Sequence, residues 1–134
     1  MENCIFCKII KEDIPCKEIH QDENFLAFLD VNPCSKGHCL IVPKKHGEDI
    51  FDFEDEECEK IIPFTKKVMK MIQEKINCDG FNVGWNNGKF AGQVVPHLHV
   101  HIIPRFKGDN GGSMHSIINN PGELKVEEVY SLFE

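Results

Sequence analysis

Three histidines at alternate positions, His97, His99 and His101, are the residues of this sequence with the strongest chemical implication. Alternate side chains of a β-strand share a face, so we expect the three imidazoles on one side and the apolar residues between them in the core. Neighbouring imidazoles repel one another when protonated, so their pKa values should be coupled and lowered, leaving at least one neutral nucleophile or ligand. A packing role is the weaker interpretation, and the run predicts either a metal site or nucleophilic and acid–base catalysis.

The segment before the histidines favours catalysis at phosphorus. Residues 84–93 read Gly-Trp-Asn-Asn-Gly-Lys-Phe-Ala-Gly-Gln. The glycines allow backbone N–H groups to approach an anion, and Asn and Gln offer neutral donors. Such a stretch alone is most often a turn, but directly before the histidines it predicts a cradle for a phosphate that one imidazole attacks.

Cys4 and Cys7 are the pair with metal-ligand spacing among the seven cysteines. Cys-x-x-Cys alone also fits two unrelated thiols or a redox pair, and a zinc site needs two more ligands, usually histidines, from elsewhere in the fold. The odd number of cysteines predicts mostly free thiols in a reducing compartment. Together with the lack of a signal-peptide pattern, this leads us to expect a cytoplasmic protein.

The surrounding elements predict an α+β fold with an antiparallel sheet. Short alternating or β-branched runs predict strands at residues 18–21, 25–30, 38–43, 81–86 and 94–104, with a hairpin at each end of the series. Apolar spacing from Ile61 to Ile76 predicts one longer helix after the acidic stretch 52–57, stopped near Gly80 and kinked at, or regular only from, Pro63. A short terminal helix is expected within residues 126–133.

Charge and hydropathy exclude several functions. Lys and Arg number 15 against 22 Asp and Glu, a net charge of −7, which argues against binding a nucleic-acid polymer. A small phosphate ligand remains compatible because it needs only local donors. No apolar run approaches the ~20 residues that span a bilayer, so we expect neither a membrane nor a nucleic-acid partner.

The histidine run and the segment before it together resemble a family signature. Asn86-x-Gly-x-x-Ala-Gly-Gln93 followed by His97-Leu-His-Val-His-Ile-Ile103 is similar to that of the histidine triad (HIT) nucleotide hydrolases and transferases, in particular the bacterial Hint-like branch. Residues 5–10, 28–33 and 37–46 resemble further family blocks in the same order. The resemblance thus covers about residues 4–106 of a single domain spanning 1–134, with 107–134 as a C-terminal extension.

This resemblance implies a fold and a reaction. The fold would be HIT-like, with an antiparallel sheet of five strands, one longer helix, short terminal helices and a two-fold homodimer. The reaction would be attack on the α-phosphorus of a purine nucleotide conjugate, namely a phosphoramidate, an adenylate or a dinucleoside polyphosphate. A nucleotidyl-histidine intermediate would form and water would resolve it.

The resemblance also implies a structural zinc and no organic cofactor. Bacterial relatives with this N-terminal pair imply Cys4, Cys7, His46 and His97 as the four zinc ligands. The ion would attach the N-terminal segment to the sheet. With His97 committed to zinc, His99 is the better nucleophile of the remaining two, because a same-face histidine flanks it on both sides and can orient it.

Residue roles follow from the same resemblance. His99 is the implied nucleophile, His101 lies beside the phosphate, His97 completes the triad and His38 is a further pocket histidine. The implied nucleotide-binding residues are Ile5, Phe6, Ile9, Phe28 and Val31 at the base, Asp30 at the ribose, and Asn86, Gly92 and Gln93 at the phosphate. On sequence alone the apolar members fit an ordinary core equally well, and Asp30 can equally cap the turn at Asn32.

Two alternatives and one departure complete the prediction. A cupin-type metal enzyme also uses His-x-His on a strand, but it needs a Glu and a later His at a spacing that this chain lacks. A non-catalytic purine-nucleotide-binding or adaptor protein is compatible with every residue above. Many Hint-like members carry Ser or Thr after the Gly-Gln pair, near the leaving group, whereas this chain has Val94.

Overall fold

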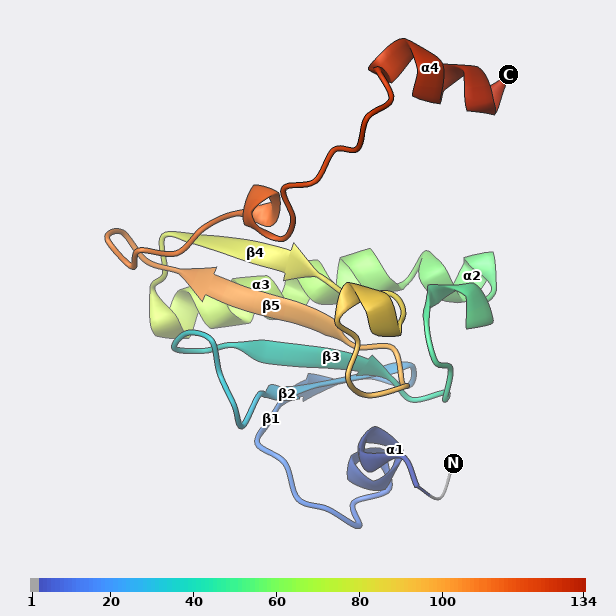
Figure 1. Cartoon of the computed structure of the whole chain (residues 1–134). Coiled ribbons are helices and arrows are strands. Elements are labelled where there is room, and N and C mark those ends of the chain that lie inside the picture. The colour runs from blue at the N-terminus through green and yellow to red at the C-terminus, as the bar shows by residue number, and fades with distance from the viewer. Residues whose placement is uncertain (1–2) are drawn as a thin grey trace.

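The structure, a computed structural model, describes residues 3–134. Within these residues five strands form one antiparallel sheet in the order β1-β2-β3-β5-β4 (Figure 1). The strands are β1 (Glu18–Gln21), β2 (Phe25–Leu29), β3 (Cys39–Pro43), β4 (Gly80–Gly84) and β5 (Val100–Arg105). The α-helices are α1 (Ile5–Ile10), α2 (Asp55–Cys58), α3 (Ile61–Ile76) and α4 (Val126–Tyr130). The predicted α+β architecture is confirmed.

The sheet separates two apolar clusters because successive side chains of each strand point to opposite faces. On β3, Cys39 and Ile41 join the cluster under α3, whereas Leu40 and Val42 join the cluster under α1. Figure 1 shows α3 lying along one face of the sheet and the short α1 near the other. The strand is therefore buried on both sides, as its uninterrupted apolar run indicates.

The longer helix confirms the predicted apolar spacing and corrects its boundaries. α3 buries Ile61, Phe64, Val68 and Ile72 against the sheet. Pro63 is the third residue of the helix, where a backbone N–H has no intrahelical acceptor, so the proline fits without a kink. The predicted stop at Gly80 is wrong: the helix ends at a left-handed Asn77 with φ of 58°, and Gly80 begins β4.

The predicted strand at residues 94–104 is too long, and the connection before it is not a tight hairpin turn. β5 begins only at Val100, where pairing with Ile41 of β3 starts, and the N–H of Leu98 instead donates to the carbonyl of Gly47. A 3-10 helix at Lys89–Ala91 lies in the β4–β5 connection. His97 and His99 therefore precede the hydrogen-bonded strand, and only His101 lies within it.

The C-terminal segment leaves the body of the protein. After β5 the chain passes through a 3-10 helix at Met114–Ser116 and ends in α4, which Figure 1 shows projecting away from the sheet. The predicted terminal helix is thus confirmed. Its apolar side chains are exposed, among them Val126, Val129 and Tyr130. No helix among residues 3–134 combines the length and the apolar character that a bilayer crossing requires.

Candidate active site

The alternation of the histidine run sets the position of the site. Val100 and Ile102 are buried in the cluster under α3. His101 is the register partner of Leu40, which belongs to the cluster under α1, so His101 lies on the α1 face. The imidazoles of His99 and His101 are neighbours with ring centroids 5.1 Å apart. The extended backbone thus keeps the imidazoles of His99 and His101 on the same side, as predicted, although His99 lies outside the hydrogen-bonded strand.

His99 is held by its backbone-facing nitrogen. Its Nδ1 lies 2.8 Å from the carbonyl oxygen of His97, and a carbonyl can only accept, so Nδ1 carries the proton and donates. In the neutral ring Nε2 then bears a lone pair. The ring of Phe6 packs edge-on at 5.1 Å between centroids, and His99 is only 8% exposed. His99 is therefore a shielded imidazole with a fixed orientation, and in its neutral form the lone pair is on Nε2.

A cavity of about 390 Å³ opens beside His99 and His101 on the α1 face. Eight of the nine residues predicted to bind nucleotide line it: Ile5, Phe6, Ile9, Phe28, Asp30, Val31, Asn86 and Gly92. Lining residues that the sequence analysis missed are Cys16, Leu29, Asn32, Leu40 and Val95, whereas Val94 was noted there for its place near the leaving group. Leu40 had a usable signal, since it lies two residues after His38 in a strand that pairs with β2. Leu29 is the last residue of β2, and the others lie at loop positions that no periodicity marks.

Asp30 has one oxygen committed and one exposed to the site. Its Oδ1 accepts the N–H of Asn32 at 2.8 Å, which is the turn-capping role anticipated as an alternative. Its Oδ2 lies 3.6 Å from Nε2 of His38. The carboxylate lines the cavity, so turn capping leaves an acceptor available for a hydroxyl group.

Gln93 does not line the same cavity, because its amide holds the loop together. Its Oε1 accepts the N–H of Gly88 at 2.8 Å, and its Nε2 donates to the carbonyls of Glu48 and Val95 at 2.6 and 2.9 Å. Gly92, which does line the cavity, has a φ of 99°, a conformation that favours glycine. Gly92 therefore shapes the loop through its backbone conformation, whereas the side-chain amide of Gln93 holds the loop by hydrogen bonds to three backbone groups.

Four side chains converge at the N-terminal end of α1 as a candidate metal centre. Nδ1 of His97 lies 3.3 Å from Sγ of Cys4, 3.6 Å from Sγ of Cys7 and 3.1 Å from Nδ1 of His46. Tetrahedral zinc, with bonds of about 2.0–2.3 Å, places such donor atoms about 3.3–3.8 Å apart. The four donors lie within 4.8 Å of one another, so a zinc ion fits after outward movements of a few tenths of an ångström.

The chemistry of this donor set also fits a cation. Nε2 of His97 lies 2.9 Å from the carbonyl of Pro43, so Nε2 carries the proton and the Nδ1 lone pair points into the cluster. Burial raises the pKa of the Cys7 thiol, and the neighbouring Cys4 raises it further, so two thiolates there need a compensating positive charge. The predicted set of Cys4, Cys7, His46 and His97 thus lies together.

Burial lowers the pKa of two histidines of the run, His97 and His101. Burial, together with the nearby His99 and His38, lowers the pKa of His101 to about 4. Burial likewise lowers the pKa of His97 to about 4, although the hydrogen bond to Pro43 opposes the shift. The lowered pKa values expected from the run are therefore found at His97 and His101.

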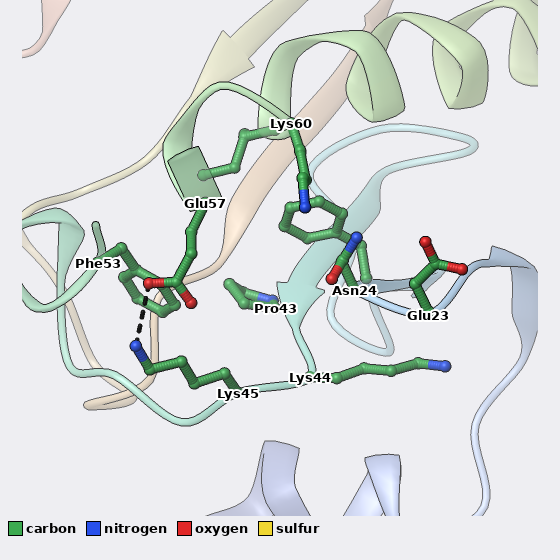
Figure 2. Close-up of a pocket in the computed structure, with 10 residues that line it drawn as sticks. Glu23, Asn24, Pro43, Lys44, Lys45, Phe53, Glu57 and Lys60 are labelled. Atoms are coloured by element: carbon green, nitrogen blue, oxygen red, sulfur yellow. Dashed lines mark hydrogen bonds and ion pairs between the residues drawn. The ribbon is translucent and has the colours of Figure 1, made fainter. Parts of the chain in front are cut away.

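A second cavity, of about 130 Å³, lies between β2, β3 and the α2–α3 region and is separate from the triad (Figure 2). Lys45 and Glu57 form an ion pair of 3.0 Å at its edge, and Lys44 and Lys60 lie on its rim. It is lined by neither histidine nor cysteine, so it contains none of the predicted chemistry.

Comparison with known proteins identifies the family. The HIT domain family matches residues 11–108, well over half of the chain. This chain belongs to the HIT family. Adenosine 5'-monophosphoramidase hnt1 of Schizosaccharomyces pombe is 48% identical over 77% of this chain and 74% of its own length. The family predicted from the histidine run is thereby confirmed.

Solved structures of HIT proteins share the fold. The crystal structure of a HIT family member from Bacillus subtilis superposes with a TM-score of 0.84 and 40% identity, covering 98% of this chain and 92% of the other. A structure titled as a zinc-bound histidine triad family protein, from Mycobacterium smegmatis, gives a TM-score of 0.77 and 37% identity, covering 81% and 79%. The first alignment includes nearly the whole C-terminal segment of this HIT protein.

Proposed function

We propose that this HIT protein hydrolyses purine nucleotide conjugates by attack of His99 Nε2 on the α-phosphorus. The observation that carries the proposal is the hydrogen bond from His99 Nδ1 to the His97 carbonyl, which leaves a lone pair on Nε2 of a ring lining the cavity. The name of the S. pombe relative, an adenosine 5'-monophosphoramidase, supports an AMP phosphoramidate as substrate. An adenylate or a dinucleoside polyphosphate presents the same α-phosphorus.

The reaction would proceed in two balanced steps. The lone pair of His99 Nε2 would form an N–P bond while the bond from phosphorus to the leaving group breaks with its electron pair, and the leaving amine would take up a proton from His101 beside the phosphate. Water would then attack the nucleotidyl-histidine, which releases AMP, restores His99 and returns a proton to His101. A histidine nucleophile suits both steps because the cationic N–P adduct is itself a good leaving group.

The nucleotide would occupy the cavity on the α1 face. Ile5, Phe6, Ile9, Phe28 and Val31 would pack on the base. The remaining carboxylate oxygen of Asp30 would accept from the ribose hydroxyls, and Asn86, Gly92 and the Gln93 segment would donate to the phosphate. His101 would lie beside the phosphate, and His97 and His38 would support the reacting pair. One cavity would thus offer contacts to a base, a ribose and a phosphate together, which favours a mononucleotide as ligand over a longer polymer.

Zinc, we propose, is structural in this protein. It would be held by Cys4, Cys7, His46 and His97, which close a tetrahedron without an open position. The M. smegmatis relative is described as zinc-bound. The ion would hold α1 against the sheet and so keep Phe6 on the ring of His99, with no part in bond breaking.

The homodimer is also a proposal. β4 is an edge strand of the sheet, and the extended segment ends in α4, which is too short to be stable without a partner surface. A second copy of the chain would cover both. Each copy would be a single domain, with the core at about residues 4–106 and the extension at 107–134.

One experiment tests the catalytic proposal. Enzyme is mixed with labelled adenosine 5'-phosphoramidate, quenched rapidly and digested to locate the labelled residue. We expect the label on His99, and His99→Ala should lose several orders of magnitude in turnover while retaining AMP binding, as in other systems where the nucleophile is removed. AMP binding with no turnover by the wild-type protein would instead support the non-catalytic binding role, and a label elsewhere would refute the assignment of His99.

A further inference from the structure

The short helix α1 belongs to two sites at once. Cys4 and Cys7, in its first turn, supply two of the four donors of the candidate metal centre. Ile5, Phe6 and Ile9, on the same six-residue helix, line the nucleotide cavity. Any change at the metal centre that moves α1 therefore also moves a wall of the cavity.

The metal centre and one apolar contact surface hold α1 on the sheet. The helix has six residues, well below the length of about 12–15 at which an isolated helix becomes even marginally stable. Sγ of Cys4 caps its first turn by accepting the N–H of Cys7 at 3.4 Å. Phe6 and Ile9 are buried in the cluster under α1, whereas Ile5 is 47% exposed. The position of α1 thus depends on its two thiols as well as on two buried side chains.

The thiols contact parts of the chain far from α1. Sγ of Cys7 lies 3.3 Å from Nδ1 of His46, 39 residues along the chain, and Sγ of Cys4 lies 3.3 Å from Nδ1 of His97, 93 residues along. His46 comes shortly after β3 and His97 shortly before β5, and these two strands are neighbours in the sheet. In the metal-binding state the thiols therefore join α1 to the sheet.

The same two thiols can instead bond to each other. The donor atoms of the cluster all lie within 4.8 Å of one another, so the two Sγ atoms can meet after side-chain rotation. Cys-x-x-Cys at a helix N-terminus is the arrangement that thiol–disulfide oxidoreductases use. A disulfide between Cys4 and Cys7 is a link inside the helical segment and leaves no thiolate for His46 or His97 to share a metal with. Oxidation would thus replace links between α1 and the sheet by a link within α1.

We propose that the Cys4–Cys7 pair is a redox switch that controls nucleotide binding through α1. Reduced and metal-bound, the pair holds α1 against the base; oxidised to a disulfide, it releases α1 and weakens the base site. The oxidant is a peroxide. Two thiolates form one S–S bond and give up two electrons, hydrogen peroxide takes these electrons and two protons to become two water molecules, and one Zn²⁺ passes to solvent. The inference rests on the proposed function for the identity of the nucleotide and on the proposed zinc site for the metal.

The coupling must act in both directions. The side chains of Cys4 and Cys7 are only 8% and 7% exposed, so an oxidant reaches them when α1 moves away from the sheet. A purine base packed on Ile5, Phe6 and Ile9 adds contacts to the closed position of α1 alone. AMP should therefore slow the oxidation of the thiols, just as the metal-bound thiols raise the affinity for AMP.

Peroxide oxidation of the zinc-loaded protein tests the switch without any turnover. Zinc release is followed with a colorimetric chelator, the disulfide is mapped by mass spectrometry, and the Kd for AMP is measured by calorimetry before and after oxidation. We expect one zinc released per chain, a Cys4–Cys7 disulfide and a Kd raised at least about fivefold, the lower end of coupling between sites. Saturating AMP should slow the release, and reduction in the presence of zinc should restore the Kd.

Control variants separate the switch from other effects of peroxide. Cys16 also lines the cavity, so Cys16→Ala removes its thiol and should leave the response to peroxide intact. Ile5→Ala and Val31→Ala are a matched pair, since both residues are exposed members of the cavity wall but only Ile5 is on α1. Each should weaken AMP binding by the reduced protein. After oxidation the effect of Ile5→Ala should fall below about twofold, whereas that of Val31→Ala should persist.

The outcomes separate this inference from the proposals on which it rests. Zinc-loaded protein that fails to bind AMP would refute the proposed function, and protein that takes up no zinc would refute the zinc site; the switch falls with either. With both intact, the absence of a Cys4–Cys7 disulfide, or a Kd that changes less than about fivefold when it forms, would refute the switch alone. Loss of the response in Cys16→Ala, or an equal effect of Ile5→Ala in both redox states, would also refute it. Circular dichroism should show that the oxidised protein keeps its helix and sheet, and global unfolding on oxidation would contradict a local switch.

Discussion

The proposed zinc site predicts a large and specific loss of stability when its thiols are replaced. The perturbation is the double variant Cys4→Ser/Cys7→Ser, which leaves His46 and His97 in place but removes both thiolates. The two remaining Nδ1 atoms lie 3.1 Å apart, and two imidazoles alone do not hold zinc in a closed site. The variant should therefore contain no zinc.

The size of the effect follows from the loop that the ion closes. Cys4 and His97 are separated by 93 residues in the chain. Treating the metal bridge like a covalent cross-link, the chain-entropy relation gives at most about 4.6 kcal/mol of stabilisation for such a loop. With an unfolding entropy of about 2.1 cal/mol/K per residue, this corresponds to a Tm lower by up to about 16 °C in a chain of 134 residues. The fall is smaller to the extent that Phe6 and Ile9 stay packed without zinc.

The assay combines metal analysis with thermal unfolding. We expect one zinc per chain in wild-type protein purified without chelators, and none in the double variant. A strong chelator should lower the Tm of the wild type and of Cys58→Ser, whose thiol lies outside the cluster, but not that of the double variant. Absence of zinc from the wild type, or a Tm within about 3 °C of it for the double variant, would refute this reasoning.

Three further predictions concern pH, assembly and the leaving group. The pKa of His101 is lowered to about 4 from 6.5, so as pH falls the unfolded chain takes up this proton first. The free energy of unfolding should therefore fall progressively between about pH 6.5 and 4, and it should fall less in His101→Gln. Urea unfolding measures both, and an equal fall in the wild type and the variant would contradict the prediction. Light scattering at micromolar concentration should give twice the 15.4 kDa chain mass, and a monomer would contradict the dimer. Val94→Ser, which adds a hydroxyl at the cavity rim, should raise kcat for amine leaving groups up to about fivefold with AMP affinity unchanged, the worth of one hydrogen bond; an unchanged or lower kcat would show that this position does not assist departure.

Local patterns predicted the elements well where one periodicity dominates. The apolar run at Cys39–Pro43 became β3, and the helical spacing from Ile61 to Ile76 became α3. Boundaries were less predictable, because they depend on competing local options. The helix ended at Asn77, three residues before the expected Gly80. Asn and Gly both tolerate the left-handed backbone conformation that ends a helix, so the sequence offered two candidate ends.

The candidate site divides in a similar way. The alternation of His97, His99 and His101 with apolar residues was enough to predict which face they occupy. It could not predict that β5 starts only at Val100, since strand hydrogen bonds depend on the partner β3 and not on the run itself. The same limit applies to Gln93, whose amide proved to bond three backbone groups of its own loop region.

The sequence by itself determined the kinds of chemistry available: imidazoles on one face, a Cys-x-x-Cys pair, a glycine-rich loop and an apolar run long enough for a buried strand. Only the tertiary structure decided which atom of each group is reactive. His38 and His101 are 63 residues apart, and Cys7 and His97 are 90 apart, so their contacts depend on strand register and on the docking of α1. Whether a ring nitrogen donates or accepts a hydrogen bond depends on the group that its ring faces. Strand register and helix docking decide which group that is.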